Sequence, residues 1–114
     1  MIFEGFKVDS EENLYRLTSG EVVEDPLSLA SSWLFSDGMS FSTRDRDNDE
    51  NNRKDCSKKL GGSGGQWLQD CAKIYFNAKY PPFPGSQSDS IIRMKLWKGD
   101  LGMMSISLAI KARK

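Results

Sequence analysis

Histidine is absent from this chain of 114 residues. The imidazole ring is the commonest general base in enzymes and the commonest protein ligand of transition metals, so both kinds of site lose their usual residue. A nucleophilic Ser or Cys would have no evident base to activate it. We therefore expect a binding or structural protein and not an enzyme.

Net charge and long apolar runs are missing as well. Sixteen basic and sixteen acidic residues cancel, so no net field attracts the chain to nucleic acid or to an anionic membrane. No apolar run approaches the roughly 18 residues of a membrane span. The start has an acidic residue, Glu4, and lacks the apolar segment of a signal peptide. We expect neither nucleic acid nor membrane as a partner.

Cysteine is scarce, with Cys56 and Cys71 alone in the chain. A zinc site would need two more Cys or His ligands, and redox catalysis would favour a Cys-x-x-Cys spacing. The neighbours Asp55, Ser57 and Asp70 are polar and do not resemble a core setting. Two free thiols and a disulfide both remain open on spacing alone.

The apolar pattern predicts an α+β fold that is mainly antiparallel sheet with short helices. One or two helical turns are expected over 27–33, and Asp37-Gly38 is a turn signal. Other short segments alternate apolar and polar side chains, which is the period of a half-buried strand. The segments predicted as strands are 3–8, 13–18, 39–43, 92–97 and 105–112.

Residues 44–66 differ sharply from the rest of the chain. Charged side chains come first, and the glycine-rich run 61–65 follows. A stretch so poor in apolar residues cannot build a core, so it is a loop, a loop-built subdomain or a disordered linker. The apolar cluster within 67–77 comes next, around the second cysteine.

Asp45, Asp47 and Asp49 have the spacing with which an EF-hand calcium loop begins. Glu50 and Cys56 then stand where that loop needs Gly and a bidentate Glu, so the EF-hand reading fails. Two interpretations remain open. The carboxylates are hard oxygen ligands for Ca²⁺, or they form a solvated charge run with the neighbouring cations Arg44, Arg46, Arg53 and Lys54.

A longer pattern surrounds these aspartates. The run Phe41-Ser-Thr-Arg-Asp-Arg-Asp-Asn-Asp49 is followed by Cys56, a glycine-rich turn, and Trp67 four residues before Cys71. This pattern resembles the C-terminal fibrinogen-related domain family, which includes fibrinogen chain ends, ficolins, tachylectins, angiopoietins and tenascin ends. The similarity begins near Phe6-Lys-Val and continues to the end of the chain, over the C-terminal half of a family domain.

The resemblance implies a partial fibrinogen C-terminal fold over 1–114. Residues 1–43 and 91–114 would form part of a central sheet, and 44–90 a loop-built calcium and ligand subdomain. The last strand enters the central sheet in this family, so 105–112 is expected to lack some neighbours, which would lower stability. The resemblance also implies a piece of a larger, multimeric, secreted protein.

The resemblance further implies a Cys56–Cys71 disulfide, an oxidising compartment and a Ca²⁺ site. Asp47 and Asp49 would supply side-chain oxygens, while Asp45 would face Arg46 or solvent. Main-chain carbonyls would come from Asn51 and Arg53. Because the stretch between Asp49 and Cys56 is about one residue longer than is common in the family, Asn52 and Lys54 are the alternatives.

A ligand pocket beside the calcium loop is the last feature that the resemblance implies. Its residues here would be Asp70, Cys71, Ala72 and Trp97, with a cis peptide bond before Cys71 as in several family members. Three positions depart from the family pattern: Gln66 replaces a Trp, Ala72 a His and Ala78 a Gly.

Two functions follow as expectations. One is a calcium-binding recognition module for an acetylated glycan or a protein, as in lectins of innate immunity. The alternative is a structural or partner-binding module of extracellular matrix or clot type, whose ligand pocket is vestigial. Trp67 is expected to pack in the core in either case.

Overall fold

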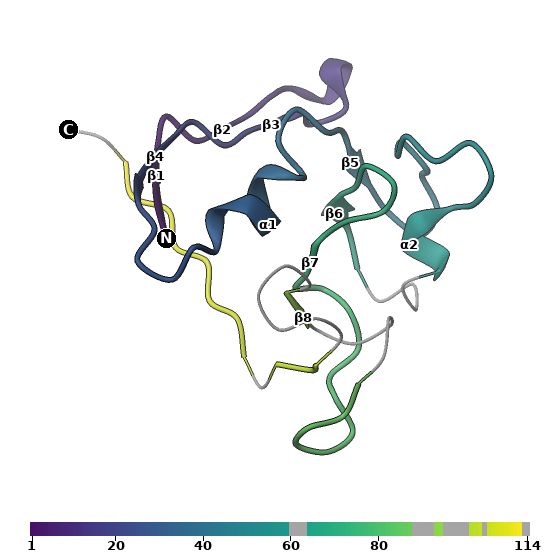
Figure 1. Ribbon diagram of the computed structural model, residues 1–114. Helices are drawn as coiled ribbons and strands as arrows, with labels where there is room; N and C mark the ends of the chain where they lie inside the picture. The colour runs from purple at the N-terminus through teal and green to yellow at the C-terminus, as the bar shows by residue number, and fades with distance from the viewer. Residues whose placement is uncertain (60–63, 88–92, 95–100, 104, 113–114) are drawn as a thin grey trace.

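The computed structural model describes residues 1–59, 64–87, 93–94, 101–103 and 105–112. The described residues form antiparallel strand pairs and two short α-helices (Figure 1). The expected α+β class with antiparallel strands is confirmed. Among the described helices, none has the length and apolar composition needed to cross a bilayer.

The amino-terminal part is a two-stranded ribbon. β1 (Ile2–Glu4) pairs with β4 (Glu21–Glu24), and β2 (Lys7–Val8) pairs with β3 (Leu17–Thr18), both antiparallel. The predicted pairing of 3–8 with 13–18 is therefore confirmed at β2 and β3. A 3₁₀ turn, Glu11–Asn13, joins these two strands. At Gly20, which has φ of +82°, a Cβ atom would lie 1.9 Å from the carbonyl oxygen of Glu4, so only glycine fits there.

The helix predicted over 27–33 is confirmed as α1 (Ala30–Leu34). The Asp25 carboxylate accepts hydrogen bonds from the backbone N–H groups of Leu29 at 2.6 Å and Ala30 at 3.0 Å. Such bonds satisfy donors that a helix start leaves free. The helix buries Trp33, whose Nε1 donates to the hydroxyl of Ser19 at 2.9 Å.

The buried residues form two clusters. In the aromatic cluster, Trp33 lies 6.3 Å from Phe3, 6.4 Å from Trp67 and 6.0 Å from Phe76, between ring centroids. These separations are typical of packed aromatic pairs. Trp67, which is partly buried, packs against the core as predicted. The fully or largely buried members of this cluster are Leu17, Trp33, Ile74 and Met94.

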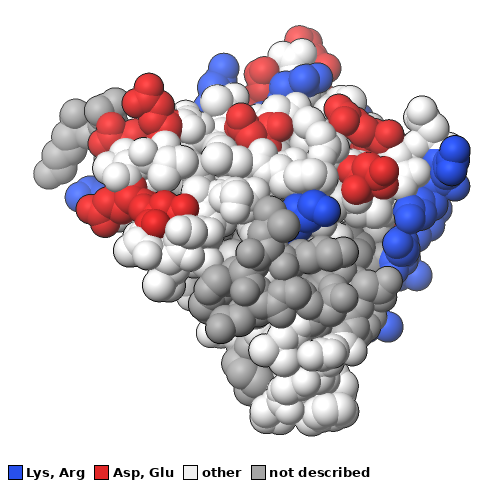
Figure 2. Space-filling view, in the orientation of Figure 1, with Lys and Arg blue, Asp and Glu red and all other residues white. Residues whose placement is uncertain are grey.

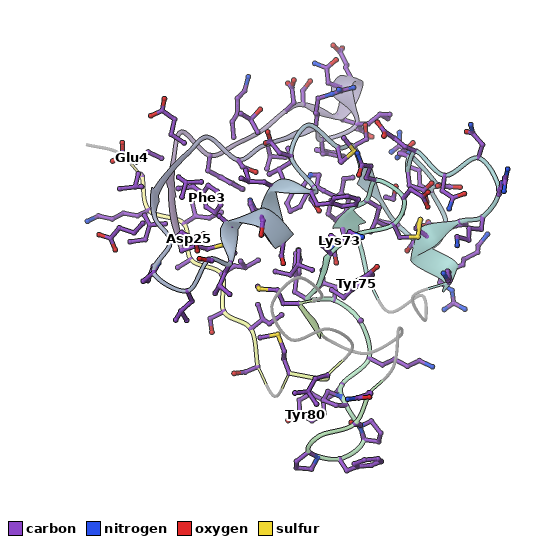
Figure 3. The ribbon with its side chains drawn as sticks, in the orientation of Figure 1. Phe3, Glu4, Asp25, Lys73, Tyr75 and Tyr80 are labelled. Carbon is purple, nitrogen blue, oxygen red and sulfur yellow. A yellow bond between two sulfur atoms is a disulfide. The ribbon has the colours of Figure 1, made fainter. Side chains whose placement is uncertain are left out.

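The second, or bridge, cluster lies around the two cysteines. Its buried members are Cys56, Leu68, Cys71, Ala72 and Tyr75. Strand β7 (Ile74–Tyr75) joins the two clusters, because successive strand residues point to opposite faces. Ile74 enters the aromatic cluster and Tyr75, labelled in Figure 3, enters the bridge cluster.

The remaining strands are short. β5 (Phe41–Ser42) pairs with β6 (Gln66–Trp67), and β7 pairs with β8 (Arg93–Met94). The strands predicted over 39–43 and 92–97 are therefore confirmed at 41–42 and 93–94, while 92 and 95–97 lie outside the described residues. The expected loop 44–66 also contains a short helix, α2 (Cys56–Lys59).

The strand predicted over 105–112 is wrong. This segment forms no strand in the structure, and the side chains of Leu108 and Ile110 are 55% and 79% exposed. It passes β1 and β4 in the view of Figure 1 without being paired to either. The alternating pattern specifies where side chains point, but a strand also needs a hydrogen-bonded neighbour.

Candidate metal and ligand site

The acidic loop leaves β5 through a tight turn and then returns to it. Thr43 and Arg46 exchange backbone hydrogen bonds of 2.9 and 3.2 Å. Asn48 then fastens the loop back on β5, since its N–H donates to the Ser42 hydroxyl and its side-chain amide to the Phe41 carbonyl, both at 2.9 Å. These bonds fix the direction in which the next residues leave the sheet.

Three carboxylates converge immediately beyond Asn48. One oxygen each from Asp47, Asp49 and Asp55 lie within 4.8 Å of one another. Ca²⁺ binds oxygens at about 2.3–2.6 Å, so two ligands of one ion are at most about 5 Å apart. The three side chains therefore fit a single hard cation, and the two predicted aspartates are brought together.

Asp49 is the most constrained of the three. Its Oδ1 accepts from the Asn51 N–H at 2.7 Å and its Oδ2 from the Cys56 N–H at 2.8 Å. Partial burial raises the pKa of the Asp49 carboxyl, the Asp47 carboxylate adds to the rise, and these two N–H groups oppose it. A cation between the carboxylates would relieve the repulsion.

Asp55 belongs to this group although the sequence did not single it out. Its Oδ1 accepts from the Lys58 N–H at 3.0 Å at the start of α2, and its Oδ2 lies 3.5 Å from the Lys58 ammonium. Its signal in the sequence is the position directly before Cys56. The cysteine and the helix start place its carboxylate beside Asp49.

Asn51 and Arg53, the predicted carbonyl donors, follow the carboxylates closely. The Asn51 side chain accepts from the Arg53 N–H at 2.9 Å and donates to the Asp70 carboxylate at 2.6 Å. The second bond joins the acidic loop to the predicted ligand pocket, a link that no sequence pattern indicated. Coordination by these two carbonyls stays a prediction.

The Cys56–Cys71 disulfide is confirmed, with its sulfurs 2.12 Å and its Cα atoms 5.4 Å apart. It lies beside α2 (Figure 3). The Asp70–Cys71 peptide bond is cis. A backbone hydrogen bond of 3.1 Å from Glu50 to Gln69 holds the two sides of this region together.

The residues predicted for the ligand pocket differ in exposure, since Asp70 is exposed and Ala72 is buried. Ala72 is buried, and its N–H donates to the Tyr75 hydroxyl at 3.4 Å. The Gln66 side chain is also buried and donates to the Ile74 carbonyl. Trp97 lies outside the described residues. A cavity of about 10 Å³, the size of one water, remains next to the bridge cluster; its lining residues are Ser57, Gly64, Gln66, Leu68, Tyr75, Asn77 and Ala78.

Charges of both signs are interspersed on the surface, in keeping with the zero net charge. Figure 2 shows acidic groups in separate places, with basic groups along the edge on the side of α2. Lys58 and Lys59 supply cations there. Among the described residues of the face drawn, charged groups of both signs are therefore present.

The sequence pattern of the family described as fibrinogen beta and gamma chains, C-terminal globular domain, matches residues 1–113. The chain belongs to this fibrinogen C-terminal family. A relative, fibrinogen-like protein 1 of Rattus norvegicus, is 32% identical over 106 residues. The match covers 85% of the chain and 33% of that protein, so the chain spans about a third of the curated relative.

Solved structures agree with the family membership. The fibrinogen-like globe domain of human ANGPTL6 matches with a TM-score of 0.75 at 22% identity, over 93% of this chain and 50% of that one. A lamprey fibrin D-dimer complexed with the peptide ligand Gly-His-Arg-Pro-amide matches with a TM-score of 0.65 at 23% identity, over 87% of this chain and 36% of that one. The resemblance seen in the sequence is confirmed, and these structures establish the fold.

Proposed function

We propose that this chain is a calcium-binding, extracellular recognition module. The convergence of Asp47, Asp49 and Asp55 carries the calcium part of the proposal. Their loop is anchored to β5 through Asn48 and to the disulfide through Cys56. Anchors at both ends hold the carboxylates in place, so less entropy is lost when an ion binds.

In this proposal the protein supplies an oxygen cage and the ion supplies compensating positive charge. Asp47 and Asp49 would bind Ca²⁺ through their side chains, and the carbonyls of Asn51 and Arg53 would add ligands. Asp55 would add a third carboxylate. The Asn51 side chain also donates to the Asp70 carboxylate. An acidic loop ordered by Ca²⁺ would therefore also restrain Asp70 in the proposed ligand pocket.

The ligand is a protein, a peptide or an acetylated glycan. A peptide complex of the lamprey fibrin D-dimer supports the first two classes, and Asp70, Cys71, Ala72 and Trp97 are the proposed contacts. The disulfide and the family support a secreted location. Membership of a larger multimer would raise avidity without any new contact.

A second function has specific support. The Ala72 N–H is taken by Tyr75, Gln66 fills the place of a family Trp, and the cavity beside the bridge cluster holds about one water. These observations favour a structural or partner-binding module of matrix or clot type, whose small-ligand pocket is vestigial. Calcium would then stabilise the loop without serving a ligand.

Ligand titration in saturating Ca²⁺ separates the two functions. Amide resonances of the ¹⁵N-labelled, oxidised chain would be followed with N-acetylglucosamine and, separately, with Gly-His-Arg-Pro-amide. Saturable shifts around Asp70 to Tyr75 that Asp70→Ala weakens would support ligand recognition. If neither compound shifts these resonances in a chain that still binds Ca²⁺, the result would support the structural function instead.

A further inference from the structure

A cleft of about 350 Å³ lies beside the first turn of the acidic loop. It is formed by the residues after the 3₁₀ turn and by the first turn of the acidic loop. Asp47, Asp49 and Asp55 do not line it. Its lining residues are Leu14, Tyr15, Phe41, Thr43, Asp45, Arg46 and Asn48.

The apolar wall of the cleft is held firmly. The Phe41 N–H donates to the Leu14 carbonyl at 2.9 Å, and the Trp67 indole donates to the Tyr15 carbonyl at 2.8 Å. The Phe41 ring packs edge-on against Trp67, with centroids 5.2 Å apart. The wall is therefore built into the structure before any ligand arrives.

Backbone conformation marks the same wall. Leu14 and Tyr15 both have positive φ, 54° and 52°, which is uncommon for residues other than glycine. Each such residue costs on the order of 1 kcal/mol and persists where the surroundings fix it, often at ligand sites. The hydrogen bonds to their two carbonyls are what fixes them here.

The polar side of the cleft offers one carboxylate that a ligand can reach. Asp45 is exposed, and its Oδ1 accepts from the Thr43 hydroxyl at 2.8 Å. The other charged lining residue, Arg46, is paired with Glu11 at 3.6 Å. The charges of Asp45, Arg46 and Glu11 sum to one negative charge. It lies beside two aromatic lining residues, Tyr15 and Phe41.

We propose that this cleft binds an alkylammonium group, such as a lysine side chain presented by a protein partner. The apolar body of the ligand would lie against Tyr15 and Phe41, and its ammonium would pair with Asp45. The faces of aromatic rings and a carboxylate both carry negative electrostatic potential, so both attract an organic cation. The proposal does not depend on the calcium site.

Three ligands of similar size test this proposal: n-butylammonium, n-butanol and n-butyrate. Their binding would be measured from the amide shifts of the ¹⁵N-labelled chain in the presence of a calcium chelator. We expect saturable shifts at Tyr15, Phe41 and Asp45, with n-butylammonium binding about two- to fivefold more tightly than n-butanol, and n-butyrate most weakly. Equal binding of the cation and the alcohol, stronger binding of n-butyrate, or shifts that do not saturate would each overturn the proposal.

Matched variants locate the effect. Asp45→Asn should weaken n-butylammonium about two- to fivefold and leave n-butanol unchanged, whereas Asp45→Glu should retain most of the preference. Asp47→Asn removes a charge two residues away that does not line the cleft, so it should weaken n-butylammonium less than Asp45→Asn does and leave n-butanol unchanged. A loss with Asp47→Asn equal to that with Asp45→Asn would place the cation at the metal site and overturn the assignment.

Discussion

The aromatic cluster and the bridge cluster are ordered by different interactions. Around Trp33, large side chains contact one another over the ribbon and α1. Around Tyr75, a disulfide and hydrogen bonds to the acidic loop replace most of that packing. The difference shows how a segment with few apolar residues gains a defined structure, since covalent and polar links supply what burial cannot.

The two clusters should therefore respond to different conditions. Apolar packing depends little on pH, on reductant or on a cation. The bridge cluster and its loop depend on all three, because they rest on a sulfur–sulfur bond and on ionised carboxylates. Variants that separate these dependences test the comparison.

The largest effect is expected in the aromatic cluster. Trp33 is 5% exposed and contacts three other aromatic rings. Trp33→Ala should lower the free energy of unfolding by about 3–5 kcal/mol, measured by urea denaturation. Trp33→Phe keeps much of the packing but loses the bond to Ser19, so it should cost less. A cost below about 1 kcal/mol for the alanine variant would show that the cluster does not sustain the fold.

The disulfide is expected to come next. Replacing Cys56 and Cys71 together by Ala should lower the free energy of unfolding by about 3 kcal/mol, because the unfolded chain regains the entropy of a closed loop of this size. Reduced wild-type protein is the matched control and should lose a similar amount. Urea denaturation would compare the free energies of unfolding of the double variant and the reduced protein with that of the oxidised chain. If both lie within about 0.5 kcal/mol of it, hydrogen bonds and not the disulfide order this region.

The pH dependence of Asp49 should be smaller and should have a definite sign. Its folded pKa lies above the unfolded value, which is near 3.9, so protonation favours the folded chain. In a chelator, its contribution to stability should rise as the pH falls from above the folded pKa toward about 3.9. Asp9 and Asp45, whose pKa values are lowered by hydrogen bonds, act in the opposite sense.

A comparison with Asn isolates that contribution. The difference in unfolding free energy between wild type and Asp49→Asn, followed by urea denaturation in steps of pH, should change in favour of wild type as the pH falls. A difference that does not vary across this window, or that changes in favour of the variant, would contradict the assigned direction.

The smallest effect is expected at the exposed carboxyl end. Leu108→Ser and Ile110→Ser should each change the free energy of unfolding by less than about 0.5 kcal/mol, since both side chains are largely in solvent. A larger loss would mean that a partner strand covers them in solution. The two-stranded sheets also predict low stability, and cooperative melting above 50 °C would argue against it.

The sequence predicted the β2–β3 pairing but missed strand β4 and its pairing with β1. Alternation at Val8 and Leu17 gave the β2–β3 ribbon, and the Asp37-Gly38 turn placed the next strand. The same kind of evidence failed at 105–112. The alternation of Leu108 and Ile110 indicates which side chains would share one face of a strand, but not whether a neighbouring strand is present. A period-two pattern is therefore a weaker prediction at the end of a chain.

The candidate site was predicted only in part. Asp47 and Asp49 followed from the motif, and the disulfide followed from the family resemblance and not from the spacing of the cysteines. Asp55 and the Asn51–Asp70 bond were missed, because contacts between side chains distant in sequence depend on the loop's path. That path is set by bonds such as those of Asn48, which leave no periodic signal.

Calcium titration by calorimetry on the oxidised chain tests the central claim most directly, with Asp47→Ala plus Asp49→Ala as the control. Saturable binding of one ion that the double variant loses is the expected result. Absence of binding by a folded sample with its Cys56–Cys71 bridge intact would contradict the account, and the acidic loop would then be a solvated charge run held by its own hydrogen bonds.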